Sequence, residues 1–369
     1  MTVTQLEIQL IAVVVAMACA LPGVFLILRR MGMLSDAISH SILLGIVLAF
    51  FITRDLASPF LVVAAALTGV LTVSLVELLY RTRLVRQDAA IGLIFPFLFS
   101  IGVILVSRYG GNVHLDTDSI LLGELAFAPF NRMMIFGWDI GPRSLYLMSG
   151  ILLLNVLFII FFFKELKLAT FDSGLASALG FFPSLLHYGL MTIVSITAVG
   201  AFDAVGSILV VALMIGPPVS AYLLTDRLAV LLMLSALIGA VASILGYWLA
   251  HFLDASIAGS IGLMIGIIFL LIYLLAPDKG ILAVVRRRHR QRVEFALEML
   301  LVHLLNHEGL PEAASECHIN HLTEHFHWEE PFAQKVIRRA DREEFLHRQE
   351  ELLVLTDSGR QRAQKSLLK

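Results

Sequence analysis

Nine apolar stretches, each about as long as a membrane is thick, occupy most of the first 280 residues. A helix needs about 20 predominantly apolar residues to cross the hydrocarbon core of a bilayer. The stretches lie near residues 10–28, 34–52, 59–80, 89–107, 144–163, 184–202, 204–224, 228–250 and 257–276. Charged residues make up only 15% of the chain, against about 25% in soluble domains. The sequence therefore predicts an all-α, polytopic membrane protein with eight or nine spans, and it excludes a soluble enzyme.

One further apolar run, 120–137, is interrupted by Glu124, Pro129 and Arg132. We interpret it as an interfacial or re-entrant piece. The neighbouring HLDTD segment contains His114, Asp116 and Asp118, which resemble a ligand cluster. Loops are normally polar, so we interpret this segment as a solvated external loop.

The last 89 residues differ from the rest in composition and indicate a second domain. Residues 281–369 carry 14 of the 27 Lys and Arg residues. We therefore expect a membrane domain over 1–280 and a small cytosolic domain over 281–369. Helical patterns at 291–307, 313–325 and 331–347, a strand at 352–355 and a last helix are typical of a winged-helix domain. The two cysteines, Cys19 and Cys317, lie in different regions, so no disulfide framework is expected.

Basic residues predict the orientation of the chain in the membrane. Lys and Arg in short loops mark the cytoplasmic side. With nine spans, one face receives Arg29, Arg30, Arg81, Arg83, Arg86, Lys164, Lys167, Arg227 and the five arginines of 286–292. This count places the N-terminus outside and the C-terminal domain inside. With one span fewer, the N-terminus would lie on the cytoplasmic side instead.

Asp36 and His40 stand four residues apart at the head of the second apolar stretch. That spacing puts both side chains on one helix face, with their roots about 5–6 Å apart. Charged groups at membrane depth mark a pathway or a binding site by default. A carboxylate and an imidazole suit Mn²⁺, Fe²⁺ or Zn²⁺, and two chains related by a two-fold axis would supply four ligands. The spacing alone leaves open a buried, hydrogen-bonded Asp–His pair that binds no metal, or an interfacial N-cap residue beside a histidine with its own hydrogen-bond partner.

The segment FDSGLASALGFFP, residues 171–183, is unusually apolar for a cytoplasmic loop. Asp172 or Ser173 can cap a short helix that runs through Ala178, and Gly180 can end it. An exposed apolar helix suggests a docking surface, although a helix lying on the membrane interface fits equally well. The candidate docking residues are Phe171, Asp172, Leu175, Ala176, Leu179 and Gly180.

Eight of the twelve histidines lie in the C-terminal region. His321 and His325 share a helix face, so they are a candidate regulatory metal pair. No complete ligand set has the spacing of a known metal motif, and a solvated His-rich helix is the favoured interpretation. From Val293 onward the balance is 9 Lys and Arg against 14 Asp and Glu, or −5. An acidic domain is a poor partner for nucleic acid, because binding depends on neutralising phosphates.

Three segments resemble one family. LPGVFLILRRMGMLSDAISHSILLGI is similar to the opening of permease subunits of manganese, zinc and iron ABC importers of the ABC-3 type. FDSGLASALGFFPSLLHYGLMTIVSITAV resembles their coupling helix, and VGSILVVALMIGPPVSAYLLTDRL resembles a late block with paired prolines. The resemblance covers about 10–276. The tail, with LTDSGRQRA, resembles the winged-helix part of iron-dependent repressors.

The resemblance implies a type II importer fold and import of Mn²⁺, Zn²⁺ or Fe²⁺ across the plasma membrane of a bacterium. It implies that Asp36 and His40 line the pore as metal ligands, and that no cofactor is bound permanently. The implied partners are a second permease chain, separate ATPase subunits, a metal-binding lipoprotein outside the cell, and membrane lipid. No Walker motif occurs, so ATP hydrolysis must come from another chain. Asp203 departs from the family pattern and receives no role.

Two other functions remain open from the residues alone. In one, the protein is a proton-coupled secondary metal transporter with Asp36 and His40 as a proton relay. In the other, it is a membrane-tethered metal sensor that reports through the His-rich tail.

Overall fold

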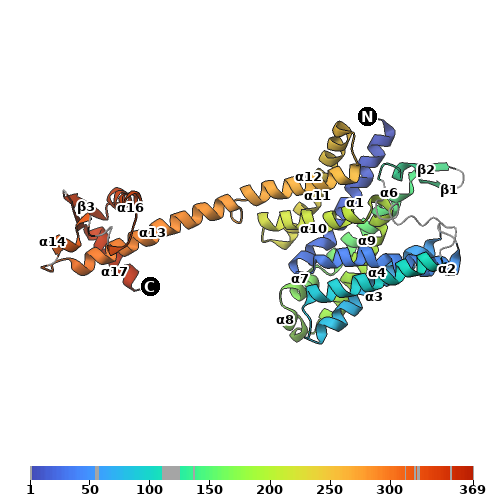
Figure 1. The fold of residues 1–369 in the computed structure, drawn as a ribbon, viewed down its shortest axis with the longest axis horizontal. Helices are drawn as coiled ribbons and strands as arrows, with labels where there is room; N and C mark the ends of the chain where they lie inside the picture. Colours follow the sequence, from blue (N-terminus) through green and yellow to red (C-terminus); the bar gives the residue numbers. More distant parts are fainter. Residues whose placement is uncertain are drawn as a thin grey trace. The chain divides into compact units, whose positions relative to one another are not determined.

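The computed structural model describes residues 2–54, 58–109, 125–135, 138–311, 313–319, 321, 325–349 and 351–368 (Figure 1). The chain divides into two compact units, Met1–Gly280 and Ile281–Lys369. The first is a bundle of long helices, and the second is a small unit of helices and one hairpin.

Nine helices of the first unit, among the residues described, are long and apolar enough to cross a membrane. They are α1 (Val3–Leu28), α2 (Met33–Thr53), α3 (Pro59–Arg81), α4 (Gln87–Tyr109), α6 (Arg143–Phe161), α9 (Pro183–Val205), α10 (Ser207–Leu224), α11 (Leu228–Leu253) and α12 (Ile257–Leu275). Each coincides with one apolar stretch of the sequence, which confirms the polytopic helical fold. Helices suit this setting because the bilayer offers no partner for a free backbone N–H or C=O.

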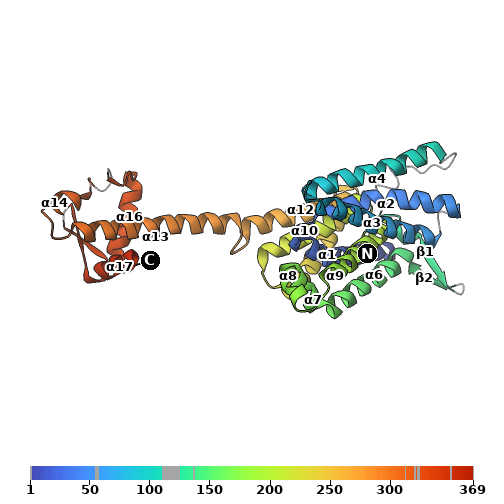
Figure 2. The same ribbon diagram turned by 90° about the horizontal axis from the view of Figure 1, so that it is seen from below.

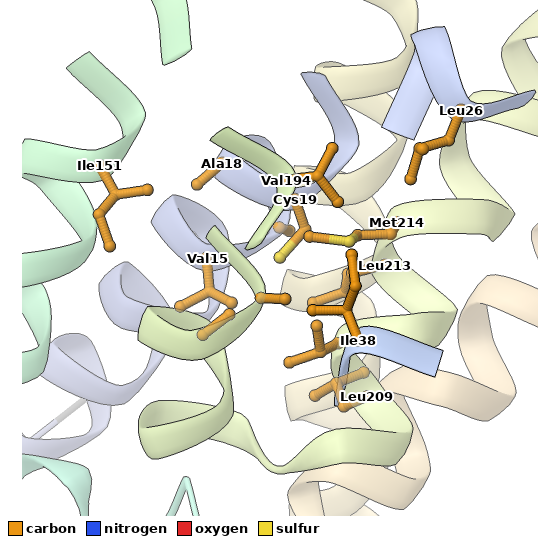
Figure 3. Packing of buried hydrophobic residues seen from close by; sticks show 14 of the residues in the cluster. Val15, Ala18, Cys19, Leu26, Ile38, Ile151, Val194, Leu209, Leu213 and Met214 are labelled. Atoms are coloured by element: carbon orange, nitrogen blue, oxygen red, sulfur yellow. The ribbon is translucent and has the colours of Figure 1, made fainter. Parts of the chain in front are cut away.

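Helix α1 lies at the centre of the first unit and packs against α6, α9, α10 and α11. Its buried face consists of small and branched apolar residues. Figure 3 shows how these meet residues of four other helices; the labelled residues are Val15, Ala18, Cys19, Leu26, Ile38, Ile151, Val194, Leu209, Leu213 and Met214. Lipid tails are as apolar as these side chains, so close packing rather than hydrophobicity holds the helices together.

Two short connections complete the first unit and lie at opposite ends of the bundle (Figure 2). Helices α7 (Phe163–Phe171) and α8 (Ser173–Ala178) join α6 to α9. At the other end, η1 (Ala128–Phe130) leads into an antiparallel hairpin of β1 (Arg132–Ile135) and β2 (Trp138–Pro142).

The hairpin corrects the all-α prediction. Residues 120–124 and 136–137 of the expected interfacial or re-entrant piece, and all of the HLDTD segment, lie outside the described residues. The described part of the piece is a turn, the short helix η1 and strand β1. Arg132 of β1 is paired with Asp139 of β2 and lies 3.4 Å from Glu7 of α1. Arg132 thus holds the hairpin against the polar start of α1.

The second unit is built around α13 (Ile281–His307). Its apolar face, Leu297, Leu300, Leu301 and Leu304, packs against the remaining elements. These are α14 (Ala313–Glu316), α16 (Glu330–Arg342), the antiparallel strands β3 (Leu346–Gln349) and β4 (Leu352–Leu355), and α17 (Asp357–Leu367).

Three elements of this unit differ from the prediction. In place of one helix over 313–325, α14 ends at Glu316 and His318 forms a β-bridge with Leu352. The first helix begins at Ile281 rather than at residue 291, and the helix expected over 331–347 ends at Arg342. Glu344 adopts a left-handed backbone (φ 57°), which stops the helix. Leu346 then pairs with Leu355 across a hairpin and is fully buried. Burial of Leu346 in the core therefore outweighs the helical propensity of the DREEF segment.

The contact between α1 and α10 allows a direct test of the packing. A Cβ atom on Gly23 would lie 2.1 Å from the backbone oxygen of Met214, whereas a Cβ on Gly150 of α6 would meet nothing within 4 Å. Overpacking a tight contact costs about 1–3 kcal/mol. We therefore expect Gly23→Ala to lower the melting temperature of the detergent-purified protein and Gly150→Ala to leave it unchanged or slightly raised. Equal melting temperatures for the two variants would contradict this packing.

Candidate functional site

Asp36 and His40 lie one turn apart at the beginning of α2. Asp36 is in the first turn, where a carboxylate interacts favourably with the positive end of the helix dipole. The Nε2 atom of His40 lies 3.3 Å from Oδ1 of Asp36, and each side chain is 31% exposed. The structure thus brings the predicted pair together on one face.

The surroundings of the pair are aromatic. The His40 ring lies 5.9 Å from the Phe95 ring and 6.1 Å from the Phe99 ring, both on α4. Among the described residues, no third His, Cys, Asp or Glu joins Asp36 and His40 to form a metal-binding group. The 3.3 Å contact is compatible with the hydrogen-bonded Asp–His pair that the spacing left open. The pair is partly exposed at the α2–α4 boundary and supplies two donor groups.

A chain of polar side chains connects four helices at the same end of the bundle as α8. Arg29, which caps α1, donates from Nε to Oγ1 of Thr170 at 3.2 Å, and its Nη1 lies 3.2 Å from Nδ1 of His187. The other ring nitrogen of His187 lies 3.4 Å from Oε2 of Glu77, and Glu77 pairs with Arg81 at 2.5 Å. The chain thus links α1, α7, α9 and α3.

This polar chain was not predicted. Arg29 and His187 are 158 positions apart, and the sequence suggested only a cytoplasmic charge for Arg29. Arg29 lies in the opening segment that resembles the family, but no spacing pattern relates it to His187, so only the packing of the helices brings the two residues together.

Helix α8 has the bounds that the sequence predicts. Oδ1 of Asp172 accepts a hydrogen bond from the backbone N–H of Leu175 at 2.9 Å, and Gly180 follows with a left-handed backbone (φ 83°). Phe171, Leu175 and Leu179 are 62%, 48% and 61% exposed. Ala176 is fully buried and therefore lies on the inner face. The segment presents an apolar surface made of three of the six candidate docking residues.

The histidines of the second unit form a cluster larger than the predicted pair. The rings of His321 and His325 stack with centroids 5.7 Å apart. The ring of His303, on α13, lies 4.6 Å from that of His307 and 4.9 Å from that of His325. Burial lowers the pKa of His303, and the adjacent His307 and His325 rings also lower it, against an opposing effect of the Glu316 carbonyl. The His303 ring is therefore more readily neutral than an ordinary histidine.

Comparisons with known proteins agree on one class. The family model described as "ABC 3 transport family" matches residues 4–276. The chain is 49% identical over 362 residues to the zinc transport system membrane protein TroD of Treponema pallidum, with 98% of each chain covered. It is 48% identical over 270 residues to the manganese transport system membrane protein MntD of Bacillus subtilis, with 73% of this chain and 91% of MntD covered.

A solved structure is similar over most of the chain. The structure of PsaBC from Streptococcus pneumoniae in complex with Fab superposes with a TM-score of 0.63 at 28% sequence identity. The match covers 75% of this chain and 94% of that chain.

The cap of α8 gives a prediction for this exposed surface. Replacing an N-cap Asp by Ala costs about 1 kcal/mol, whereas Asn caps about as well as Asp. We expect Asp172→Ala to accelerate amide hydrogen exchange over 173–179, and Asp172→Asn to keep exchange close to that of the wild type. Similar protection in both variants would show that the Leu175–Asp172 hydrogen bond does not hold the helix.

Proposed function

The chain belongs to the ABC 3 transport family, and we propose that it is the permease subunit of an ATP-driven importer of a divalent transition metal, Mn²⁺, Zn²⁺ or Fe²⁺. One observation carries the choice of substrate: a carboxylate and an imidazole, 3.3 Å apart, stand half-exposed in an otherwise apolar helix. Both groups are ligands for these borderline metals. Relatives named for zinc, manganese and chelated iron transport support the same class.

The Asp36–His40 pair is proposed to be half of a transport site that a second permease chain completes. Two donors cannot satisfy a metal ion that takes four or more ligands. Two copies of the pair, or the equivalent pair of a homologous chain, would surround an ion with two carboxylates and two imidazoles. The exposure of the pair supports this arrangement, since each of the two side chains is 31% exposed in the single chain and can accept a neighbour on that side. The ion is transported cargo, and no permanently bound cofactor is proposed.

Energy for transport is proposed to come from separate ATPase subunits that dock on α8. Three apolar side chains, Phe171, Leu175 and Leu179, offer an exposed surface on a capped helix, with Asp172 and Gly180 defining its ends. The polar chain connects the α7–α8 segment mechanically to the start of α2. Thr170, at the end of α7, holds Arg29, and Arg29 ends the helix that immediately precedes α2. Movement of α8 would therefore be transmitted to the start of the helix that carries Asp36.

The orientation of the bundle in the membrane determines where the remaining partners would bind. The α8 end is proposed to face the cytoplasm, because Arg29, Arg81 and the other basic loop residues gather there. The end with the β1–β2 hairpin would then face outward (Figure 2), where a metal-binding lipoprotein can deliver the ion. Membrane lipid would surround the bundle in the bacterial plasma membrane, with the C-terminal unit in the cytoplasm.

The C-terminal unit is proposed to be a domain of winged-helix type. Helices α13, α14 and α16, followed by the β3–β4 hairpin and α17, have the element order expected of such a domain. Its acidic balance favours a partner other than nucleic acid. Arg339 of α16 is partly buried and is already paired with Glu294 at 2.7 Å and with Glu343 at 2.8 Å.

Family membership favours ATP-driven import over the two alternatives. Uptake that continues without any ATPase partner would instead support a proton-coupled secondary transporter. Loss of regulation with normal uptake after deletion of 293–369 would make the tail a regulator of a transporter rather than the sensor itself.

The transport site is tested by substitutions that separate ligation from structure. Asp36→Asn keeps a side chain that can hydrogen-bond His40 but removes the charged ligand. We expect both Asp36→Asn and His40→Ala to reduce initial uptake of Mn²⁺ or Zn²⁺ by more than about tenfold, at equal membrane expression and equal ATPase association. Uptake is measured in cells that lack other importers of the ion.

The matched control is Asp254→Asn. Asp254 is an exposed carboxylate that ends α11 with a left-handed backbone, a conformation that Asn also tolerates. It should transport as the wild type does. Normal uptake by Asp36→Asn and His40→Ala would refute the ligand role and leave the family assignment intact.

The docking surface is tested by polar substitutions that preserve the helix. Removing hot-spot side chains from an interface commonly costs 2 kcal/mol or more. We expect the double variant Leu175→Gln/Leu179→Gln to lower the affinity for the ATPase subunits at least about tenfold and to reduce uptake. Co-purification from detergent measures the association.

Leu310→Gln serves as the control, because Leu310 is 48% exposed, as is Leu175, but lies in the C-terminal unit. It should leave the association unchanged. Undiminished ATPase binding by the double variant would exclude α8 as the docking surface.

A further inference from the structure

The histidine cluster of the second unit gathers donor groups from separate segments of the chain. His303 and His307 lie one turn apart on α13, and Glu316 ends α14. Nε2 of His303 lies 3.8 Å from Oε2 of Glu316, and Nε2 of His321 lies 2.9 Å from that oxygen. One carboxylate oxygen therefore faces two imidazoles.

Three of these residues could hold one ion. A donor atom from each of His303, His307 and Glu316 lies within 4.8 Å of the other two. Ligands bound about 2.0–2.2 Å from a tetrahedral metal lie about 3.5 Å apart. Small side-chain rotations would bring the three donor atoms to this separation. Among the described residues it is the only group of three His, Cys, Asp or Glu side chains that meets this distance criterion.

The hydrogen bonding of the cluster is incomplete. The Nδ1 atom of His307 is buried and has no hydrogen-bond partner among the described residues, and Nε2 of His321 lies near Glu316 without hydrogen-bonding geometry. A buried polar atom without a partner costs about 1–3 kcal/mol. A cluster kept only for packing would be expected to satisfy these atoms, and a bound ion would do so.

The protonation state of the His303 ring also favours binding of a cation. Metal-binding imidazoles are neutral, and burial of His303 favours its neutral form by lowering the pKa. The side chain of His303 is only 8% exposed, whereas those of Glu316 and His321 are 23% and 37% exposed, which leaves a route from solvent.

We propose that the C-terminal unit binds one divalent transition-metal ion of the imidazole-preferring kind, typified by Zn²⁺, through His303, His307 and Glu316. His321, 2.9 Å from Glu316, is the nearest candidate for a fourth ligand. The site differs from the transport site in every residue. It joins α13 to α14 and to the histidines near residue 321, so occupancy would fasten these segments together.

The test uses the full-length protein, purified in detergent without a polyhistidine tag, in an Asp36→Asn/His40→Ala background. That background removes the transport pair, so failure of the tail site and failure of the proposed transport function are distinguishable. Zn²⁺ is titrated against a competing chelator of known affinity. We expect one tight site per chain, an affinity at least about tenfold weaker in His307→Ala and in Glu316→Gln, and a higher melting temperature with Zn²⁺.

His347→Ala is the matched control, since His347 is an exposed histidine of β3 outside the cluster. It should bind Zn²⁺ as the parent does. Circular dichroism checks that each variant is folded, and Glu316→Gln keeps the shape of the side chain if His307→Ala is unstable. No tight site in the parent, or equal affinity in His307→Ala, Glu316→Gln and His347→Ala, would overturn the proposal.

Discussion

The first unit depends on one constraint, which is that a bilayer supplies no hydrogen-bond partner for the backbone and no hydrophobic drive between helices. The nine long helices among the described residues satisfy their backbone hydrogen bonds internally. The helices are held together by close packing around α1, where Gly23 lets the backbone of α10 approach. Helices α6, α9, α10 and α11 pack around α1. The buried Asn155 of α6 is paired within this core, because its Nδ2 donates to the backbone oxygen of Ala18 and to Oγ1 of Thr197.

The Asp36–His40 pair is significant because of that constraint. A charged side chain is costly inside a bilayer, and mutual pairing of Asp36 and His40 offsets part of this cost at the start of α2. The pair nevertheless stays half-exposed at the α2–α4 boundary. An isolated chain therefore holds two donors whose remaining face is uncovered. A two-fold partner gives a physical reason for keeping them there, because the interface would supply the other ligands and exclude lipid.

The polar chain and the histidine cluster both consist of side chains from separate segments that the packing of helices brings together. Arg29, Thr170, His187 and Glu77 come from four helices, and each reaches a partner only because those helices end at the same level. In the second unit, His303 and His307 meet Glu316 because α13 packs against α14. Polar groups that gather from distant segments limit how the elements can shift, which suits a protein whose proposed task couples docking at α8 to movement near Asp36.

The sequence by itself determined the features that depend on local pattern. Nine apolar stretches became nine candidate spans, Asp172 and Gly180 bounded α8 as predicted, and three segments pointed to the family that the comparisons confirm. These depend on span length, capping and residue order, which are local properties. Only the tertiary structure decided the β1–β2 hairpin, the strand at Leu346–Gln349, the polar chain from Arg29 and the grouping of His303 with Glu316. Each of these depends on partners brought together by packing, and a linear pattern carries no information about which distant residues will meet.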